Sequence, residues 1–412
     1  MPVSYLETAD VTEVVCVKNF VFHNPTKILF GKDTVGKIGD EIASFGVKRV
    51  LFVYGGGSIK RNGVYDAVVE SLGQAGVEYV EFPGIKPNPV LSKVYDGIEA
   101  ARREGVGGVL AVGGGSVIDS SKAIGAGALY DGDVWDFFSG KAFAKESLPI
   151  FVVLTISATG SEMNGNAVIT HDDTLAKRPF RSPAVYPKVS VIDPSVQFSL
   201  PREQTVYGAI DAMTHVFEFY FSCPEVGVTD RINEGLVKTI MDSAEKLVED
   251  PGDYYHRANL AWSATLALNG ISGAGTGGGD WSTHRIEHAL SAVYDIAHGA
   301  GLAIVFPAWL RYVAEHSPPH VSAEVKNKIL MFGKEVFSMQ GSSYVGVIER
   351  LKKWYSDMGA PVYLEDAGIS PDEIDTLATN PSIPYPLGSV KKLDVEDVRN
   401  ILRLATRLAA DE

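Results

Sequence analysis

From Asn19 onward, short apolar runs alternate with segments whose apolar residues repeat every four positions. Residues 49–54 form a run typical of a buried strand, and Gly-Gly-Gly-Ser follows at 55–58. Val64, Val68 and Leu72 then repeat at four-residue spacing, which predicts a helix near 63–76. Further strands are expected at 77–82, 108–112 and 149–154, and further helices at 90–104 and from the loop 113–116 to about residue 129. This alternation predicts a parallel sheet with helices on both faces.

Two other regions have different patterns. Residues 1–18 show no clear pattern and are interpreted as a tail, whereas Phe20 to Phe30 predict a strand, a turn at Asn24-Pro25 and a second strand. Beyond Pro201 the chain consists of long amphipathic stretches. These predict helices at 205–222, 228–249, 254–270, 281–293, 299–316, 323–338, 342–358 and 393–409. We therefore expect an α/β domain at 1–199 and an all-helical domain at 200–412, with a site in the crevice between them.

Composition narrows the choice of partners. The 412 residues are 45% hydrophobic and 21% charged, as in an ordinary globular protein. The formal net charge of −14 disfavours nucleic acid and anionic membrane surfaces, because both require clustered cations. Two cysteines make no disulfide framework, and neither a membrane-length apolar run nor a signal peptide is evident. The expected location is the cytoplasm.

Glycine loops follow two of the predicted strands, at 55–58 and at 113–116. Glycines let a backbone approach a phosphate, although a tight strand-to-helix turn needs them equally, so each loop alone supports both readings. Ser116 and Asp119 also match a helix-capping pattern. Neither loop is a GxGxxG or a P-loop. A third polar loop, 155–162, follows another strand, and three such loops at one sheet edge favour a ligand site.

A carboxylate and several histidines have spacings that suit a metal ion. Asp211 and His215 are four residues apart on one predicted helix, as are His284 and His288 on another, and His298 follows ten residues later. Taken singly, each has an ordinary explanation: Asp211 as a helix-terminal charge, His284 as a surface partner of Glu287, and His288 as a core histidine. Taken as a set, they favour a divalent ion held by imidazoles and one carboxylate.

These motifs together resemble the iron-containing (group III) alcohol dehydrogenases, in particular the butanol dehydrogenase-like branch. The resemblance runs from Asn19 to about Ala410. The motifs that carry it are Phe20-x-Phe22-x-Asn24-Pro25-Thr26-Lys27, Tyr54-Gly-Gly-Gly-Ser58-Ile-Lys60, Pro87-Asn88-Pro89, Gly113-Gly-Gly-Ser116-x-x-Asp119, Ala158-Thr159-Gly160-Ser161-Glu162, Asp193-Pro194, Asp211-x3-His215, His284-x3-His288 and Ala297-His298-Gly299.

The resemblance implies a Rossmann-like dinucleotide-binding domain followed by a helical domain, as in dehydroquinate synthase-like architectures. It also implies one divalent metal, Fe²⁺ by family with Zn²⁺ or Ni²⁺ as alternatives, on Asp211, His215, His284 and His298. His288 would lie near the nicotinamide without binding the metal and is a candidate proton relay, with water and the coenzyme ribose as rivals. The coenzyme contacts implied are Gly56, Gly57, Ser58, Asn88, Gly114, Gly115, Ser116, Asp119, Thr155, Thr159 and Lys177.

The activity implied is hydride transfer between NAD(P)(H) and a primary alcohol or aldehyde such as butanol or butanal. NADP(H) is favoured over NAD(H), because no acidic residue in the first glycine loop would repel a 2′-phosphate and Lys60 and Arg61 lie just beyond it. Trp281, Phe306 and Trp309 either wall an apolar substrate pocket or pack between helices. The rival hypotheses are a glycerol dehydrogenase- or dehydroquinate synthase-like enzyme and a non-catalytic nucleotide sensor. The early strand near Phe20 to Ile28 suggests a homodimer.

Overall fold

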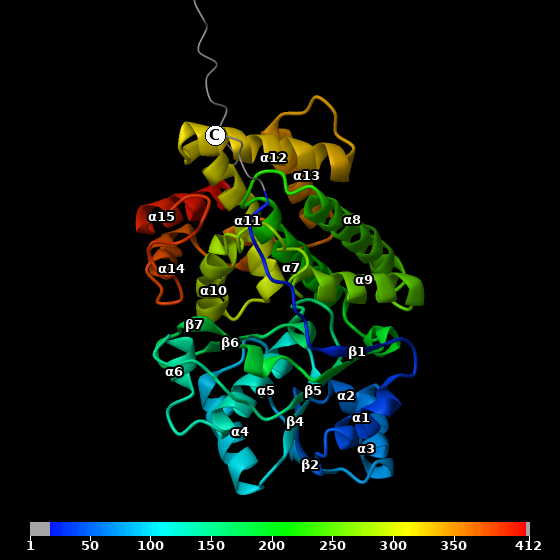
Figure 1. Cartoon of the computed structure of the whole chain (residues 1–412). Coiled ribbons are helices and arrows are strands. Elements are labelled where there is room, and N and C mark those ends of the chain that lie inside the picture. Colours follow the sequence, from blue (N-terminus) through cyan, green and yellow to red (C-terminus); the bar gives the residue numbers. More distant parts are fainter. Residues whose placement is uncertain (1–16, 409–412) are drawn as a thin grey trace, which may run out of the picture.

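The N-terminal half is built on a six-stranded parallel sheet in the order β1-β8-β5-β4-β2-β3, as seen in a computed structural model that describes residues 17–408 (Figure 1). Neighbouring strands pair in register along their length, for example Val109 with Ile150 and Leu51 with Val109. The strands are β1 (Lys27–Phe30), β2 (Arg49–Tyr54), β3 (Glu78–Phe82), β4 (Gly108–Gly113), β5 (Ile150–Leu154) and β8 (Val189–Ile192).

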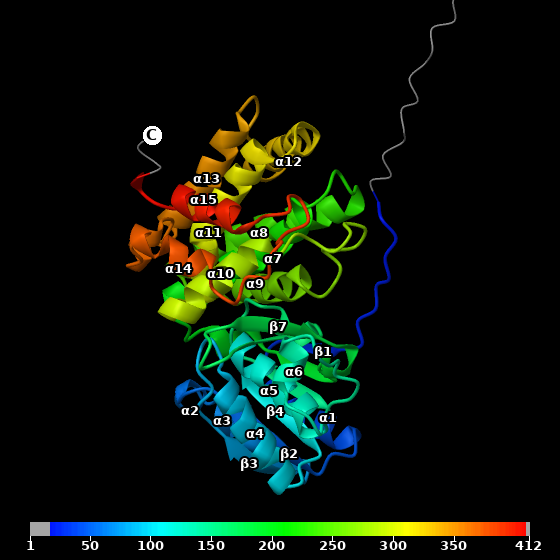
Figure 2. The same ribbon diagram turned by 90° about the vertical axis from the view of Figure 1, so that its left-hand side faces the viewer.

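Helices cover both faces of this sheet, which is why its central strands lack polar alternation (Figure 2). Every residue of β4 and β5 is buried. One face packs on α1 (Ile38–Ser44) and α3 (Val64–Gln74), and the other on α4 (Leu91–Arg103) and α5 (Gly115–Ala128). The predicted α/β organisation with a parallel sheet is therefore confirmed.

The strand order reverses direction between β2 and β4. The chain passes from β2 outward to the edge strand β3, then crosses back to β4 on the other side of β2. In an open α/β sheet, ligands bind outside the carboxyl ends of the strands at such a switch point. The two glycine loops follow β2 and β4, so they flank this position.

Several short elements differ from the prediction. Only Lys27–Phe30 forms a strand in the segment where two strands were predicted, because residues 17–26 run in an extended path along the helical half instead of pairing. Lys18 N donates to Gly275 O at 2.9 Å, and Asn24 Nδ2 donates to Met163 O and Asn269 O. The pattern did not predict α2 (Ser58–Arg61), α6 (Trp135–Phe138), α14 (Ile374–Ala378), the antiparallel pair β6 (Asn166–Thr170) and β7 (Lys177–Arg181), or β8.

The C-terminal half is helical, as predicted, and each long helix lies within a few residues of its expected range. Its core includes Phe217, Phe306 and Trp309, which are almost wholly buried. The helices are α7 (Arg202–Tyr220), α8 (Val228–Glu249), α9 (Tyr254–Ala267), α10 (Ser282–Tyr294), α11 (His298–His316), α12 (Pro319–Phe337), α13 (Tyr344–Asp357) and α15 (Val395–Leu404). Short 3-10 turns complete the chain at Val35–Lys37, Ser161–Met163, Pro183–Val185, Pro194–Gln197, Leu364–Ala367 and Pro371–Glu373. Between residues 17 and 408, no helix combines the length and apolar character required to cross a membrane.

Candidate active site

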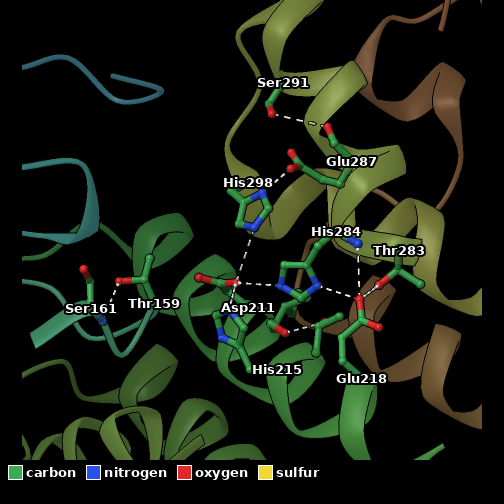
Figure 3. Close-up of polar contacts among 12 residues, drawn as sticks. Thr159, Ser161, Asp211, His215, Glu218, Thr283, His284, Glu287, Ser291 and His298 are labelled. Carbon is green, nitrogen blue, oxygen red and sulfur yellow. Dashed lines mark hydrogen bonds and ion pairs between the residues drawn. The ribbon is translucent and has the colours of Figure 1, made fainter. Parts of the chain in front are cut away.

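Three helices bring the four predicted metal ligands together at the face of the helical half nearest the sheet (Figure 3). Asp211 and His215 lie one turn apart on α7, His284 lies in the first turn of α10, and His298 begins α11. Nε2 of His215, His284 and His298 lies 3.6, 3.9 and 3.7 Å from Asp211 Oδ1. Three imidazoles thus converge on one carboxylate oxygen.

The unsatisfied atoms of this cluster fit a cation. Asp211 Oδ1 and His284 Nε2 are buried without a hydrogen-bond partner among the described residues. A buried carboxylate oxygen facing only imidazole nitrogens is costly unless a positive charge compensates it. Burial lowers the pKa of His215 to about 3 and holds the pKa of His284 well below its ordinary value. Both rings are therefore neutral, which is the form that binds a metal.

The four side chains are not equally close. The donor atoms of Asp211, His284 and His298 all lie within 4.8 Å of one another, and His215 joins them through Asp211. A second group with comparable spacing contains Glu287, His288 and His298. In that group Glu287 and His298 are already hydrogen-bonded to each other, so the first group is the better metal site.

Two buried glutamates lie behind the histidines and were not predicted. Glu218 Oε1 lies 2.7 Å from His284 Nδ1, and Glu287 Oε2 forms a hydrogen bond with His298 Nδ1. A carboxylate on Nδ1 fixes the ring and leaves the Nε2 lone pair facing the metal position. The surface pairing considered between His284 and Glu287 is wrong: both are buried, and they serve different partners.

Helical spacing could have revealed both glutamates. Asp211, His215 and Glu218 lie at i, i+4 and i+7 of α7, and Glu287 lies one turn after His284 on α10. What spacing could not show was which carboxylate supports which histidine, because those pairs join different helices.

The two glutamates differ in electrostatics. Burial raises the pKa of Glu218 to about 7, against hydrogen bonds from Thr283 and from the backbone of Trp281 and His284. Burial opposes ionisation of Glu287 too, but the neighbouring charges of His298 and Lys177 outweigh it, so its pKa is lowered. Glu287 is therefore the more firmly ionised of the pair.

His288 lies one turn beyond His284 on α10, and its ring centroid is 5.6 Å from that of His298. The side chain is 5% exposed, and its Nδ1 has no partner within the described part of the chain. Burial and then the charge of Lys177 hold the pKa of His288 well below its usual value. It is a neutral imidazole beside the cluster.

Two glycines allow the close approach of helices that forms the site. A Cβ on Gly208 of α7 would lie 2.4 Å from Ser157 O, in the loop after β5. A Cβ on Gly299 of α11 would lie 2.0 Å from Tyr207 O. Gly208 therefore seats Asp211 against the third polar loop, and Gly299 seats His298 against α7.

The three polar loops predicted to bind a coenzyme follow the carboxyl ends of β2, β4 and β5. Gly84 N donates to Gly55 O at 3.0 Å, and Thr155 N donates to Gly113 O at 3.0 Å. A Cβ on Gly115 would lie 2.4 Å from Thr159 Cγ2, whereas a Cβ on Gly56 would meet no atom within 4 Å. The second and third loops thus pack on each other, the first loop contacts the turn after β3, and the backbone at Gly56 borders open space. This arrangement fits a nucleotide laid across them.

The side chains of this edge are partly available to a ligand. Gly57, Ser58, Gly114, Ser116 and Thr155 are all at least partly exposed. The predicted Ser116–Asp119 cap is wrong, because α5 begins after Gly114 without a side-chain cap. Asp119 instead accepts hydrogen bonds from Ser161 Oγ at 2.6 Å and from Val168 N at 2.9 Å. Asp119, on α5, therefore holds the third polar loop in place through Ser161.

Asn88 and Lys177 contact residues of both halves of the chain. Lys177 Nζ donates to Asn88 Oδ1 at 2.9 Å and to Ser291 Oγ at 2.8 Å, and it lies 3.9 Å from Glu287 Oε2. Asn88 Nδ2 in turn donates to Ile296 O in the loop before α11. The pair therefore connects the sheet half to the carboxylate behind His298.

The three aromatic residues that either wall a substrate pocket or pack between helices have different roles. Phe306 and Trp309 are buried, and Phe306 stacks on Phe217 at 4.8 Å between ring centroids, so both pack between helices. Trp281 is partly exposed and its ring lies 5.3 Å from His284 and 6.4 Å from His215. Only Trp281 adjoins the histidine cluster.

Together, a nucleotide-type switch point and a facing cluster of histidines with one carboxylate define a class: oxidoreductases that use a nicotinamide coenzyme and a divalent metal. Comparisons with known proteins agree. The profile of iron-containing alcohol dehydrogenases matches residues 25–194, and that of the C-terminal part of the Fe-containing alcohol dehydrogenase family matches residues 205–406. This chain belongs to the iron-containing alcohol dehydrogenase family.

Similar proteins cover almost the whole chain. A probable NADH-dependent butanol dehydrogenase of Bacillus subtilis is 42% identical, covering 94% of this chain and 99% of its own. An NADPH-dependent aldehyde reductase of Escherichia coli is 36% identical, covering 88% of this chain and 92% of its own. The crystal structure of NADH-dependent butanol dehydrogenase A from Thermotoga maritima superposes with a TM-score of 0.91 at 54% identity, over 95% and 99%. The chain is therefore an enzyme of NAD(P)H-dependent alcohol and aldehyde oxidoreduction, and the two rival hypotheses are not favoured.

Proposed function

We propose that this enzyme interconverts primary alcohols and aldehydes of about the size of butanol, with NADP(H) favoured as coenzyme and NAD(H) as the alternative. The observation that carries the proposal is the convergence of three imidazole Nε2 atoms on the buried Oδ1 of Asp211, opposite the carboxyl edge of the sheet. The substrate size is taken from the names of the butanol dehydrogenases that the chain resembles.

Asp211, His215, His284 and His298 would hold the metal, with Fe²⁺ as the family's ion and Zn²⁺ or Ni²⁺ compatible with the same donors. Once bound, the ion would supply Lewis-acid polarisation of the substrate oxygen. Glu218 and Glu287 orient two of the imidazoles. His298, with 23% of its side chain exposed against 3–7% for the other three ligands, marks the open side where a substrate would enter.

The coenzyme would lie across the loops after β2, β4 and β5, and it would supply or accept the hydride. Gly56, Gly57, Ser58 and Asn88 would border the adenosine end, and Gly114, Gly115 and Ser116 the pyrophosphate. Thr155, Thr159 and Lys177 would complete its contacts, with Asp119 acting through its hydrogen bond to Ser161. NADP(H) is favoured because the exposed loop Gly56–Ser58 carries no carboxylate.

His288 would pass the proton between the reacting oxygen and solvent. It is a neutral ring in contact distance of the cluster, and its Nδ1 has no competing partner among residues 17–408. The neutral ring can accept a proton from the reacting oxygen, and because its pKa is lowered it would hold that proton only briefly before releasing it to solvent.

We also propose that the enzyme is a homodimer. The boundary between its α/β domain and its helical domain is proposed to lie between residues 199 and 200.

One experiment tests the metal site and the relay together. Protein purified without air is analysed for bound metal and assayed with butanal and butanol, using NADPH and NADH in turn. His284→Ala should lose metal and activity together, whereas His288→Ala should retain metal and turn over more slowly by roughly 10²-fold or more. Full activity of His284→Ala with normal metal would refute its role as a ligand, and metal loss in His288→Ala would make that residue a ligand.

A further inference from the structure

Two cationic residues, Lys60 and Arg61, follow the first glycine loop, and their side chains make different contacts. Both lie on the short helix α2 and both are exposed. From the sequence they are equivalent candidates to meet a negatively charged ribose. Their side-chain partners separate them.

Lys60 is engaged by a carboxylate from another strand. Its Nζ donates to Glu81 Oε2 at 3.2 Å and lies 4.4 Å from the centre of the Tyr65 ring. Glu81 also accepts a hydrogen bond from Tyr54 Oη, and one from Tyr65 Oη at 2.6 Å. Glu81 is on β3, 21 residues beyond Lys60, so inspection of the loop sequence alone does not reveal it.

The charge on Glu81 is secure. Hydrogen bonds from Tyr54, then Tyr65, lower the pKa of Glu81, so the carboxyl stays ionised at neutral pH. The pair with Lys60 is partly exposed, at 46% and 37% of the two side chains, and so contributes little to stability. The ion pair acts locally: Glu81 neutralises the positive charge of Lys60 and holds its ammonium group toward β3.

Arg61 points the other way, onto the loop. A Cβ built on Gly57 would lie 3.1 Å from Arg61 Nη1, so the guanidinium rests against the Gly57 backbone. Arg61 forms no ion pair with any residue from 17 to 408. Next to it, Gly56 borders open space. Of the two cations that follow the loop, Arg61 is therefore the one that contacts it without a carboxylate partner among residues 17–408.

We propose that Arg61 is the residue that recognises the 2′-phosphate of NADP(H), and that Glu81 sets the strength of that preference by withholding Lys60. The inference rests on the proposed placement of the coenzyme's adenosine end at Gly56–Ser58. A guanidinium binds phosphate through two parallel hydrogen bonds, which gives it an advantage over a lysine that is already paired.

The test measures binding by calorimetry on the full chain, with 2′,5′-ADP and 5′-AMP as probes, because these differ only in the phosphate concerned. Arg61→Gln should weaken 2′,5′-ADP by about 10–100-fold and leave 5′-AMP nearly unchanged. Lys60→Gln should alter neither affinity substantially. Glu81→Gln should strengthen 2′,5′-ADP several-fold by freeing Lys60. The matched control is Glu78→Gln, on the same strand but paired with Arg49.

Each outcome decides the matter. The assignment is overturned if Arg61→Gln binds 2′,5′-ADP as tightly as the wild type does. It is also overturned if Lys60→Gln loses as much 2′,5′-ADP affinity as Arg61→Gln does. In both cases a wild-type affinity for 5′-AMP would show that the nucleotide site itself is intact. An equal loss of both probes in Arg61→Gln also overturns it, since that result indicates damage to the loop. If the wild type binds neither probe, the proposed coenzyme site itself fails. The gain in Glu81→Gln should disappear in the double variant with Lys60→Gln.

Discussion

At the scale of single residues, the site depends on pairs of side chains, each of which leaves one atom free. Glu218 occupies Nδ1 of His284 and leaves Nε2 facing Asp211. Glu287 does the same for His298. The proposed ligands are thus already oriented without a cation, which would reduce the entropy cost of binding one.

The support from Glu218 can be measured directly. Glu218→Gln removes the carboxylate behind His284, so we expect metal affinity to fall roughly 10–100-fold while Asp211 and the three histidines remain. Competition with a chelator of known affinity provides the measurement. Glu225→Gln, an exposed glutamate just after the same helix, is the control and should leave affinity unchanged. Equal affinities for the two variants would show that Glu218 is not needed to orient its histidine.

At the scale of elements, α7 is the centre of the arrangement. It contributes Asp211 and His215, contacts the third polar loop through Gly208, and receives the start of α11 through Gly299. Backbone approaches this close exclude a Cβ. The third polar loop and the proposed metal ligands are consequently fixed relative to each other by the backbone of one helix.

This arrangement predicts a specific effect of a single methyl group. Gly208→Ala places a Cβ 2.4 Å from Ser157 O, so α7 and the loop must separate. We expect stability to fall by about 1–3 kcal/mol and turnover to fall further than metal content does. Thermal unfolding would measure the loss of stability. Metal analysis together with steady-state rates would compare the loss of turnover with the loss of metal.

The control for that substitution is Gly235→Ala on α8, where a Cβ meets no atom within 4 Å. Helix propensity alone should make this variant as stable as the parent, or more stable by up to about 1 kcal/mol. A Gly208→Ala enzyme with wild-type turnover would mean that the distance between α7 and the loop is unimportant for catalysis.

At the scale of the whole molecule, an apolar surface lies along the N-terminal segment. Phe20, Val21 and Phe22 are 56%, 94% and 50% exposed, and they lead into β1, which is an edge of the sheet. Monomers rarely expose adjacent large apolar residues beside a free strand edge. This surface is where the proposed homodimer would form.

Light scattering after size exclusion would test it. The wild type should have the mass of a dimer, and Val21→Asp should shift the mass toward that of a monomer, because a charge would be buried in the contact. Leu129→Asp, at the end of α5 and 48% exposed, is a control that should not change the mass. A wild-type monomer, or a Val21→Asp dimer of unaltered affinity, contradicts the proposal.

Much of the architecture could be predicted from the sequence, because periodicity is a local property. The α/β half, the parallel sheet and all eight long C-terminal helices were predicted. The missed strands β6, β7 and β8 lack a continuous apolar run: β7 contains three basic residues and Pro179, β6 begins with Asn166 and ends with Thr170, and Ser190 interrupts β8. The first of the two strands predicted between Phe20 and Phe30 does not form, because alternation cannot show whether a partner strand is available.

The sequence by itself determined which side chains share a helix face, such as Asp211 with His215, since that depends only on residues one turn apart. Tertiary structure alone decided which faces meet: that His284 and His298 approach Asp211, that Glu218 and Glu287 support them, and that Glu81 neutralises Lys60. The physical reason is that backbone geometry fixes contacts within one turn of a helix. Contacts between elements depend instead on how the entire core packs.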